Sequence, residues 1–296
     1  MWVWGPKRYR RATKGALLLA LVLMFVPATA EAFDEIQVYN AEIAEVGQWT
    51  IQQHLNYAFK APNEPDFPGG FAPNHALNGT PELAYGLTPW WEIGFYLPFA
   101  VADNQFLSDG GKIRTLSVSP HAADRNFFYG VNLEFDYGTP PFGQSLFNIE
   151  MRPIIGWRNK EWEFIINPIV DFATGRYGEA DFVPAVRLAR KLGEDFYIGA
   201  EYYADFGKIT NALPLQQQQQ LLFAVTDFKA GVFDIDLGLG FGLTSGSDQL
   251  IGKIIIGYAF PAPGGDKSSD SNAMMPRLMA PARRATGLSP VSVLLH

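Results

Sequence analysis

Residues 147–172 carry the clearest pattern of hydrophobic and polar positions in the chain. Apolar side chains occupy every second position in two runs, residues 147–157 and 162–172, and mainly polar side chains fill the positions between them. Such alternation predicts two β-strands with one apolar face each, and the polar joint at residues 158–161 predicts a hairpin turn. Ten residues at a rise of about 3.3 Å and a tilt of about 45° span roughly 23 Å, which matches the apolar band of a transmembrane β-barrel.

The same alternation continues from residue 49 to residue 260. It predicts an all-β fold, an antiparallel up-and-down transmembrane β-barrel of about twelve strands. The predicted strands cover residues 49–59, 76–87, 91–101, 112–118, 127–137, 146–157, 162–172, 181–190, 195–206, 220–228, 233–243 and 250–260.

The connections and the aromatic residues predict which way the barrel faces. Most connections after even-numbered strands are short, whereas most after odd-numbered strands are longer, such as residues 60–75 and 207–219. Outer-membrane barrels have short periplasmic turns and long outer loops, so both barrel ends are expected on the periplasmic side. A soluble β-sandwich is the alternative, but it does not need aromatic residues at both ends of its strands. The predicted aromatic girdle at the turn end comprises Trp49, Trp91, Trp157, Trp162 and Phe260.

The segments on either side of the barrel have different compositions. Residues 1–32 combine five basic residues, an apolar run at 16–26 and small residues at 28–32, which predicts a cleaved Sec-type signal peptide. Residues 33–48 are expected to form a periplasmic N-terminal segment, with a short plug inside the barrel as the alternative. Residues 261–296 are rich in Pro, Ala, Ser and Gly and are expected to be a disordered tail. The predicted location is the outer membrane of a Gram-negative bacterium.

The distribution of charge limits the expected partners. The net charge is −7, but residues 33–260 hold 14 Lys and Arg against 27 Asp and Glu, which argues against a nucleic-acid partner. The expected partners are outer-membrane lipid and lipopolysaccharide, the barrel-assembly machinery and a small-molecule solute.

Polar residues on the inward face of the strands are expected to line the lumen. Carboxylates outnumber basic residues on this face, and four Asp lie near the outer mouth, which predicts a lumen that prefers cations. The alternative is a closed barrel in which the carboxylates pair with the basic residues, as Arg152 could with Glu150 and Glu134. The predicted lumen-lining residues are His54, Glu82, Tyr96, Asn132, Glu134, Asp136, Glu150, Arg152, Asn167, Asp171, Asp181, Arg187, Glu201, Tyr203, Asp205 and Lys253.

Candidate catalytic residues are few. The chain has no Cys and four His, of which only His54 lies inside a predicted strand, with Gln52 and Asn56 as its neighbours on that face. A lipid hydrolase needs a nucleophile within reach of a His base, and no Ser lies near His54 in sequence. No paired His spacing indicates zinc, and no glycine loop indicates a phosphate site. The sequence therefore predicts no enzyme activity, no cofactor and no metal site.

Five prolines interrupt the predicted strands at nearly one height above the periplasmic end. Proline lacks a donor for the strand ladder, so bulges are expected there. Pro98 is expected to point inward and the other four outward. A further hypothesis is that three prolines on neighbouring strands weaken the wall enough to admit apolar solutes sideways. The five residues are Pro81, Pro98, Pro153, Pro168 and Pro184.

One hairpin resembles a known family. The stretch YGLT at residues 85–88, followed by WEIG at residues 91–94, is similar to outer-membrane barrels grouped as MetA-pathway-of-phenol-degradation proteins. The sequence motif is confined to this hairpin, whereas the resemblance in architecture extends over residues 49–260. It implies a barrel of about twelve strands that takes up small apolar or aromatic compounds, and it assigns no binding residue.

Together these patterns predict an outer-membrane β-barrel that acts as a narrow channel or uptake pore for small solutes. A plugged structural barrel without transport is the first alternative. A lipid-modifying outer-membrane enzyme is the second.

Overall fold

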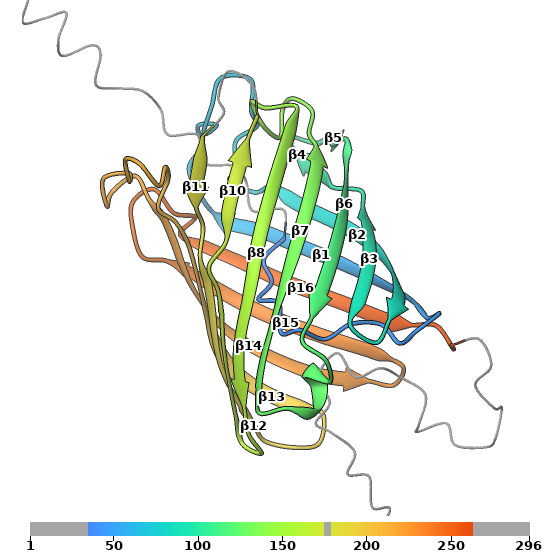
Figure 1. Ribbon diagram of the computed structural model, residues 1–296. Helices are drawn as coiled ribbons and strands as arrows, with labels where there is room; N and C mark the ends of the chain where they lie inside the picture. The colour runs from blue at the N-terminus through green and yellow to red at the C-terminus, as the bar shows by residue number, and fades with distance from the viewer. Residues whose placement is uncertain (1–34, 175–178, 263–296) are drawn as a thin grey trace, which may run out of the picture.

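The computed structural model describes residues 35–174 and 179–262, and these residues form a closed antiparallel barrel of twelve strands. The predicted fold class is confirmed. Figure 1 shows the tilted strands from the side. The strands are β1 (Trp49–Lys60), β2 (Leu77–Thr88), β3 (Trp91–Tyr96), β4 (Phe99–Ala102), β5 (Gln105–Ser108), β6 (Gly111–Val118), β7 (Phe127–Tyr137), β8 (Phe147–Arg158), β9 (Trp162–Asn167), β10 (Val170–Ala173), β11 (Ala180–Phe182), β12 (Ala185–Lys191), β13 (Phe196–Asp205), β14 (Gln219–Ala230), β15 (Phe233–Gly242) and β16 (Leu250–Ala259).

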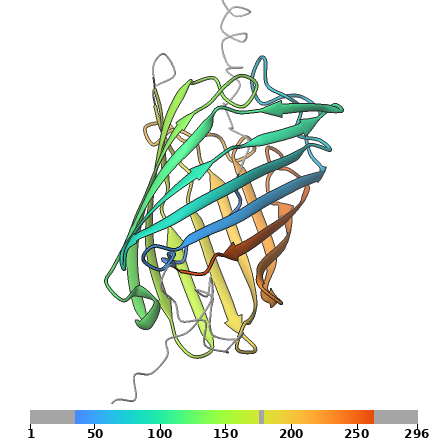
Figure 2. The same cartoon turned by 90° about the vertical axis from the view of Figure 1, so that its right-hand side faces the viewer.

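Sixteen hydrogen-bonded segments make twelve barrel strands because four of the barrel strands are interrupted. The interrupted strands are β3 with β4, β5 with β6, β9 with β10, and β11 with β12. Each strand pairs with its sequence neighbour, and β1 pairs with β16 to close the ring. Figure 2 shows these two strands side by side, β1 in blue and β16 in red. A closed ring leaves no unpaired sheet edge, which is the condition for strands to cross a membrane.

Prolines account for three of the interruptions. Pro98, Pro168 and Pro184 lie in the gaps between β3 and β4, β9 and β10, and β11 and β12. At one of these gaps the amide of Ile169 donates to the carbonyl of Asn167 at 3.0 Å, a local bond in place of a ladder bond. Proline therefore breaks the ladder while the strand continues in the same direction.

The prolines also line up across the wall. The register between β8 and its neighbours β9 and β10 is the same on both sides of the gap, and it sets Pro168 opposite Pro153. The register of β11 and β12 likewise sets Pro184 opposite Pro168. Pro98 is buried, whereas the other four prolines are partly exposed. Three adjacent strands thus carry a row of prolines at one height.

Side chains alternate between the lumen and the outer surface along the strands. In β16 the burial pattern switches at every residue from Leu250 to Ala259. The outer surface has exposed aromatic residues at the turn end of the strands, namely Trp49, Trp91, Phe127, Trp157, Trp162, Phe196, Phe233 and Phe260. At the other end Phe59, Tyr137, Phe147 and Phe172 are also exposed. The turn-end group includes the five residues of the predicted girdle, Trp49, Trp91, Trp157, Trp162 and Phe260.

One hairpin extends further than the sequence predicted. Residues 102–111 were expected to be a loop, but β4 and β5 continue the third and fourth barrel strands beyond the end of β7. Asp103 and Asn104 close this hairpin with positive φ angles of 50° and 60°. Such angles suit a tight hairpin turn and the Asp and Asn residues that tolerate them.

The remaining expectations for the chain ends fall outside the described part of the chain. The signal peptide (residues 1–32) and the tail after residue 262 belong to these ends. Within residues 35–174 and 179–262, no helix is long and apolar enough to cross a membrane.

Candidate functional site

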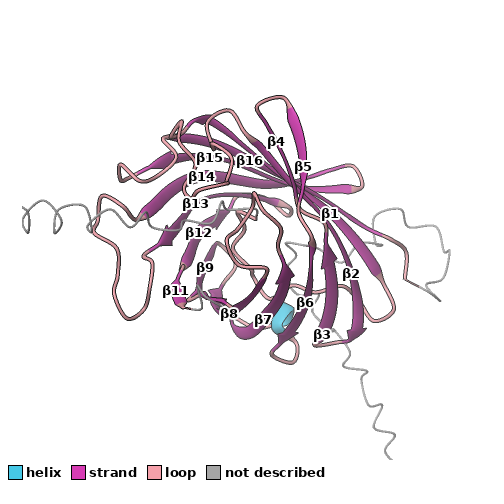
Figure 3. Cartoon of the chain, turned by 90° about the horizontal axis from the view of Figure 1, so that it is seen from above, coloured by secondary structure: helices cyan, strands magenta, loops and turns pink. Residues whose placement is uncertain are grey.

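Residues 35–44 lie inside the barrel, and residues 45–48 lead from there to β1, with Glu45 and Val46 exposed. Ile36, Val38, Ala41 and Ala44 are almost completely buried. Seen from above, the ring of strands encloses a lumen that a loop segment enters (Figure 3). The sequence favoured a periplasmic segment here and kept a plug as the alternative, and the structure has the second arrangement. We call residues 35–48 the plug segment.

The wall holds the plug segment mainly through the backbone of the plug. Lys253 Nζ donates to the Ile36 carbonyl at 3.1 Å, and Arg152 donates to the Gln37 carbonyl at 3.1 Å. Arg158 donates to the Asn40 carbonyl at 2.7 Å. Hydrogen bonds from a cation to a carbonyl keep a buried backbone group satisfied, so an irregular segment can remain stable away from water.

Asn167 makes the most specific contact with the plug segment. Its Oδ1 accepts a hydrogen bond from the Tyr39 amide at 2.7 Å, and its Nδ2 donates to the Tyr39 carbonyl at 3.1 Å. The Tyr39 hydroxyl also bonds to the Tyr96 hydroxyl at 2.6 Å on the opposite side of the lumen. Tyr39 is thereby fixed at both its backbone and its side chain.

The periplasmic end of the plug segment docks on the hairpin formed by β2 and β3. The Gly47 amide donates to the Gly86 carbonyl at 2.8 Å, and the Ala44 amide donates to Glu92. A Cβ atom at Gly86 would stand 2.2 Å from the Glu45 carbonyl oxygen, so only glycine permits this approach. The hairpin at residues 85–94, which stands out in the sequence, is thus a docking site for the plug.

Apolar side chains fill the space between the plug segment and the wall. The plug residues Ile36, Val38, Tyr39 and Ala41 belong to one buried cluster with inward residues of the strands. The wall contributes Leu116, Val118, Phe128, Ile154, Ile165, Ile169, Ala185, Tyr203, Leu221, Phe223, Val225 and Ile251, together with Ala122 of the short 3-10 helix at Ala122–Asp124. The hydrophobic core of this barrel therefore lies in its lumen.

Two cations organise the charges on the β12–β16 side of the lumen. Arg187 bonds to Glu163, to Glu201 at 2.5 Å and to Asp227. Lys253 bonds to Glu201 at 2.6 Å and lies 3.3 Å from Asp236. Arg187, Lys253, Glu201 and Asp227 are almost completely buried. Removing one partner would therefore leave a buried charge uncompensated.

A second ion cluster forms on the β1–β6 side. Arg114 lies 2.5 Å from Glu82 and 2.6 Å from Glu92. His54 Nε2 is 3.4 Å from the other oxygen of Glu82. The Arg114 guanidinium also stands 5.8 Å from the ring centre of Tyr39, within the range of a cation–π contact. This cluster therefore touches the plug segment as well as four strands, β1, β2, β3 and β6.

A third cluster involves β6, β7 and β8. Arg152 bonds to Glu150 at 2.6 Å and 2.8 Å, and Lys112 is 3.9 Å from Glu134. Arg152 also stacks over the Tyr39 ring at 4.5 Å. The pairing of Arg152 with Glu150 is the arrangement expected for a closed barrel.

Arg158 differs from its expected place. The sequence placed it in the turn at residues 158–161, whereas it is the last residue of β8 and faces the lumen. It lies 3.7 Å from Glu42 of the plug and 3.4 Å from Glu163. Burial raises the pKa of Glu42 well above its usual value, and Arg158 opposes part of that rise.

A further group of carboxylates lies at the loop end of the barrel. Asp171 on β10 and Asp181 on β11 are directly opposite each other, and Asp205 ends β13. Outside the strands, burial raises the pKa of Asp66 to about 6, with a further contribution from the charge of Asp248. Burial also raises the pKa of Asp248 to about 6.

The predicted lumen residues occupy the inner face in two groups. Asp136, Asp171, Asp181 and Asp205 lie toward the outer mouth, and Glu150 is half-buried below them. The group around the plug segment is almost completely buried and comprises His54, Glu82, Tyr96, Asn132, Glu134, Arg152, Asn167, Arg187, Glu201, Tyr203 and Lys253.

The sequence missed several charged residues that hold this arrangement together. Lys112, Arg158 and Asp227 face the lumen, and Glu42 comes from the plug segment. Asp227 was missed because its face of β14 is otherwise apolar, with Leu221, Phe223 and Val225 pointing inward. Polar residues were expected to mark the lumen face, and this strand does not follow that rule.

Among the described residues, no group of three or more His, Asp or Glu side chains has the arrangement of a metal site. No site for a cofactor emerges from the ion clusters, in which cations and carboxylates bind one another. The arrangement is thus a lumen filled by the plug segment, an apolar cluster and three ion clusters, with further carboxylates at the loop end.

Comparisons with known proteins agree with the fold. No protein-family model and no curated protein matches the chain, so the resemblance of residues 85–94 to the phenol-degradation barrels stays a prediction. Among solved structures, the chain is similar to the COG4313 outer membrane channel from Pseudomonas putida F1, with a TM-score of 0.56, 10% identity and coverage of 76% of this chain and 100% of that one. It also matches the NanC porin, with a TM-score of 0.45, 10% identity and coverage of 71% and 98%. The chain therefore has the β-barrel fold of outer-membrane proteins.

Proposed function

We propose that this protein is an outer-membrane channel for small solutes and that the plug segment closes it in the present conformation. The observation that carries this proposal is the way the plug is held. Wall side chains bind the plug backbone at Ile36, Gln37, Tyr39 and Asn40 through hydrogen bonds, without a covalent link. Such contacts can be exchanged for water when the segment moves, which leaves a polar passage behind.

The similarity in fold to the COG4313 outer membrane channel supports this function. The proposed location is the outer membrane, with the exposed aromatic residues of the barrel in contact with lipid and lipopolysaccharide. Delivery to the barrel-assembly machinery after Sec-type export belongs to the same proposal. The proposal includes no catalytic role.

The proposed solutes are small, and cations are preferred over anions. Asp171, Asp181 and Asp205 stand at the outer mouth, whereas Arg114, Arg152, Arg187 and Lys253 form their ion pairs around the plug segment. A mouth that is negative relative to the plugged half concentrates cations at the entrance. Uptake of apolar or aromatic compounds is proposed only on the resemblance of residues 85–94.

The alternative is a plugged barrel without transport. The extent of the buried ion network favours this alternative, because a plug bound by Arg152, Arg158, Asn167 and Lys253 makes many contacts that must break together. The two functions differ in whether the plug segment leaves its site under physiological conditions.

Single-channel recording in a planar lipid bilayer separates them. The channel proposal predicts brief conductance steps from the purified full chain, and their reversal potential in a salt gradient should show a preference for cations. A silent bilayer that demonstrably contains folded protein would support the plugged barrel instead.

A further inference from the structure

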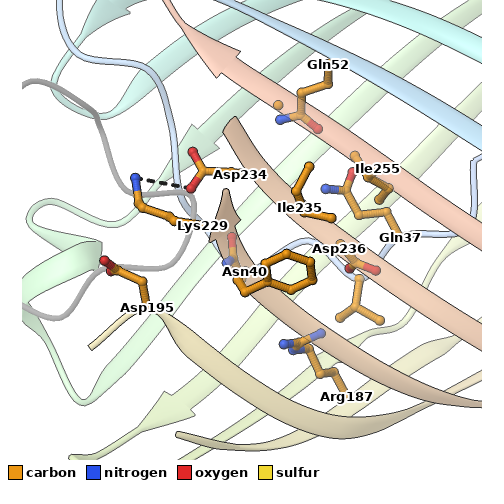
Figure 4. Close-up of a pocket in the computed structure, with 13 residues that line it drawn as sticks. Gln37, Asn40, Gln52, Arg187, Asp195, Lys229, Asp234, Ile235, Asp236 and Ile255 are labelled. Carbon is orange, nitrogen blue, oxygen red and sulfur yellow. Dashed lines mark ion pairs between the residues drawn. The ribbon is translucent and has the colours of Figure 1, made fainter. Parts of the chain in front are cut away.

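A cavity lies at the turn end of the lumen, between the plug segment and strands β14 to β16. The space between its lining residues, part of it open to solvent, measures about 620 Å³. Figure 4 shows Gln37 and Asn40 of the plug on one side and Asp234, Ile235 and Asp236 of β15 on the other. Because the cavity lies beside the plug rather than above it, a ligand could enter from the periplasmic side while the plug stays in place.

Four oxygen atoms that border this cavity have no hydrogen-bond partner among the described residues. One of them, Asp236 Oδ1, is ion-paired with Lys253 at 3.3 Å, and the other three are Gln52 Oε1, Asp195 Oδ1 and Asp234 Oδ2. Gln52 and Asp234 are each 8% exposed, so bulk water does not freely solvate them. Buried acceptors are normally paired, and three unpaired ones around one cavity indicate a missing donor.

The cations of the cavity cannot supply that donor. The Lys229 ammonium lies 3.1 Å from Asp234 Oδ1, the other oxygen of that carboxylate. Arg187 is bound by Glu163, Glu201 and Asp227. The lining therefore offers acceptors and negative charge to a ligand, and its own donors are directed elsewhere.

Beside the polar residues Gln37, Asn40 and Asp236, the lining has an apolar part. Val38 of the plug and Ile255 of β16 contribute it, and both are almost completely buried. An all-polar ligand such as a hydrated metal ion would leave these side chains without favourable contacts. A ligand with a charged donor group and a short hydrocarbon chain matches both parts of the lining.

We propose that this cavity binds a small organic cation, a protonated primary amine. Its ammonium group pairs with the unpaired oxygen of Asp234, and Gln52 and Asp195 offer further acceptors around the cavity. Its alkyl chain packs against Val38 and Ile255. This names a solute class for the channel, and to that extent it rests on the proposed function.

Calorimetric titration of the detergent-solubilised full chain with n-butylamine tests this inference, and n-butanol serves as a probe of the same length without charge. We expect one butylamine per chain and binding of butanol at least about tenfold weaker, the difference expected for one charge-assisted hydrogen bond. Equal binding of the two probes, or no heat from butylamine up to about 10 mM, would overturn the proposal.

Two variants and a control locate the binding. Asp234→Asn removes the charge and keeps the shape, and it should weaken butylamine binding about tenfold or more. Gln52→Leu removes an acceptor without changing charge and provides a second test if the first variant fails to fold. Asp124→Asn, on an exposed residue of the 3-10 helix outside the cavity, should bind like the wild type. A folded Asp234→Asn or Gln52→Leu variant with unchanged affinity would contradict the assignment.

Conductance recorded on the same preparation separates this inference from the proposed function. A protein that conducts ions but does not bind butylamine would keep the channel and refute the amine site. A protein that binds butylamine but never conducts would keep the site and refute the channel.

Discussion

Lys253 on β16 joins the wall of the barrel to the plug segment. Its ammonium group donates to the Ile36 carbonyl at 3.1 Å and pairs with Glu201 at 2.6 Å. The two residues Lys253 and Ile36 are 217 positions apart in the sequence. One buried cation therefore serves both the charge balance of the lumen and the position of the plug.

Replacing this cation should both weaken the barrel and free the plug. Lys253→Met keeps the length of the side chain but leaves Glu201 and Asp236 without their partner. Breaking one side of a buried ion pair costs about 3–5 kcal/mol, so the free energy of unfolding in urea should fall by that order. Channel openings should become more frequent at the same time.

Lys160→Met is the matched control, because Lys160 is exposed in the turn after β8. It should change neither quantity. A Lys253→Met protein with the stability and gating of the wild type would show that this contact does not hold the plug.

The outer loops should respond to pH. The pKa of Asp66 and that of Asp248 are both raised to about 6 in the folded protein, above the value of about 3.9 for a free Asp. A carboxyl with a raised folded pKa favours the packed loop below its unfolded pKa, and this contribution is lost as pH rises through about 6. The loop at residues 61–76 should therefore pack more tightly at pH 5 than at pH 7.5.

An environment-sensitive dye at Glu64→Cys measures this packing, since the chain has no other Cys. Its emission should change with a midpoint near pH 6. The change should disappear in a variant that also carries Asp66→Asn and Asp248→Asn. A transition that survives in this variant would assign the pH response to another group, such as the nearby Asp205.

The acidic mouth should set the ion preference. Asp171→Asn together with Asp205→Asn removes two charges at the outer end of β10 and β13. The reversal potential in dilute salt should shift toward zero, while Asp124→Asn should leave it unchanged. At 1 M salt the screening length is about 3 Å, so all three proteins should become less selective. Preference for anions in the wild type would refute this role of the mouth.

The row of prolines allows a test of sideways entry. Pro168 lies opposite Pro153 on one neighbouring strand and opposite Pro184 on the other. The inward apolar residues Ile154 and Ile169 follow two of these prolines in the sequence. Replacing the three prolines by Val should restore ladder bonds there. If apolar solutes enter through this part of the wall, their uptake by cells should slow while ion conductance stays the same. Unchanged uptake would leave the prolines as tolerated bulges.

Much of the barrel follows from local pattern, as β8 illustrates. Its alternating residues predict a strand at 146–157, and the strand found is Phe147–Arg158. The aromatic belts follow for the same reason, because lipid-facing positions recur at every second residue. The hairpin of β4 and β5 was missed because its strands are short and extend past the neighbouring strand. The two faces of these strands also show little contrast between apolar and polar residues.

The plug could not be located from the sequence because its contacts are distant and mostly involve its backbone. Tyr39 binds Asn167, which is 128 residues away, through its amide and carbonyl groups. Backbone groups leave no trace in the pattern of side chains. The apolar inner residues Phe128 and Phe223 were an available signal, since a water-filled lumen has no use for them.

The most direct test of the plugged channel replaces the plug without shortening the chain. Residues 36–44 are exchanged for Gly and Ser, and single-channel conductance is compared with that of the wild type. A matched exchange of residues 214–217, in an outer loop, controls for loss of side chains in general. We expect conductance steps several times larger for the plug variant than for the other two proteins, because its lumen is no longer filled by Ile36, Val38 and Tyr39. Equal conductance in all three, or silence in all three although each is folded, would contradict a channel that the plug segment closes.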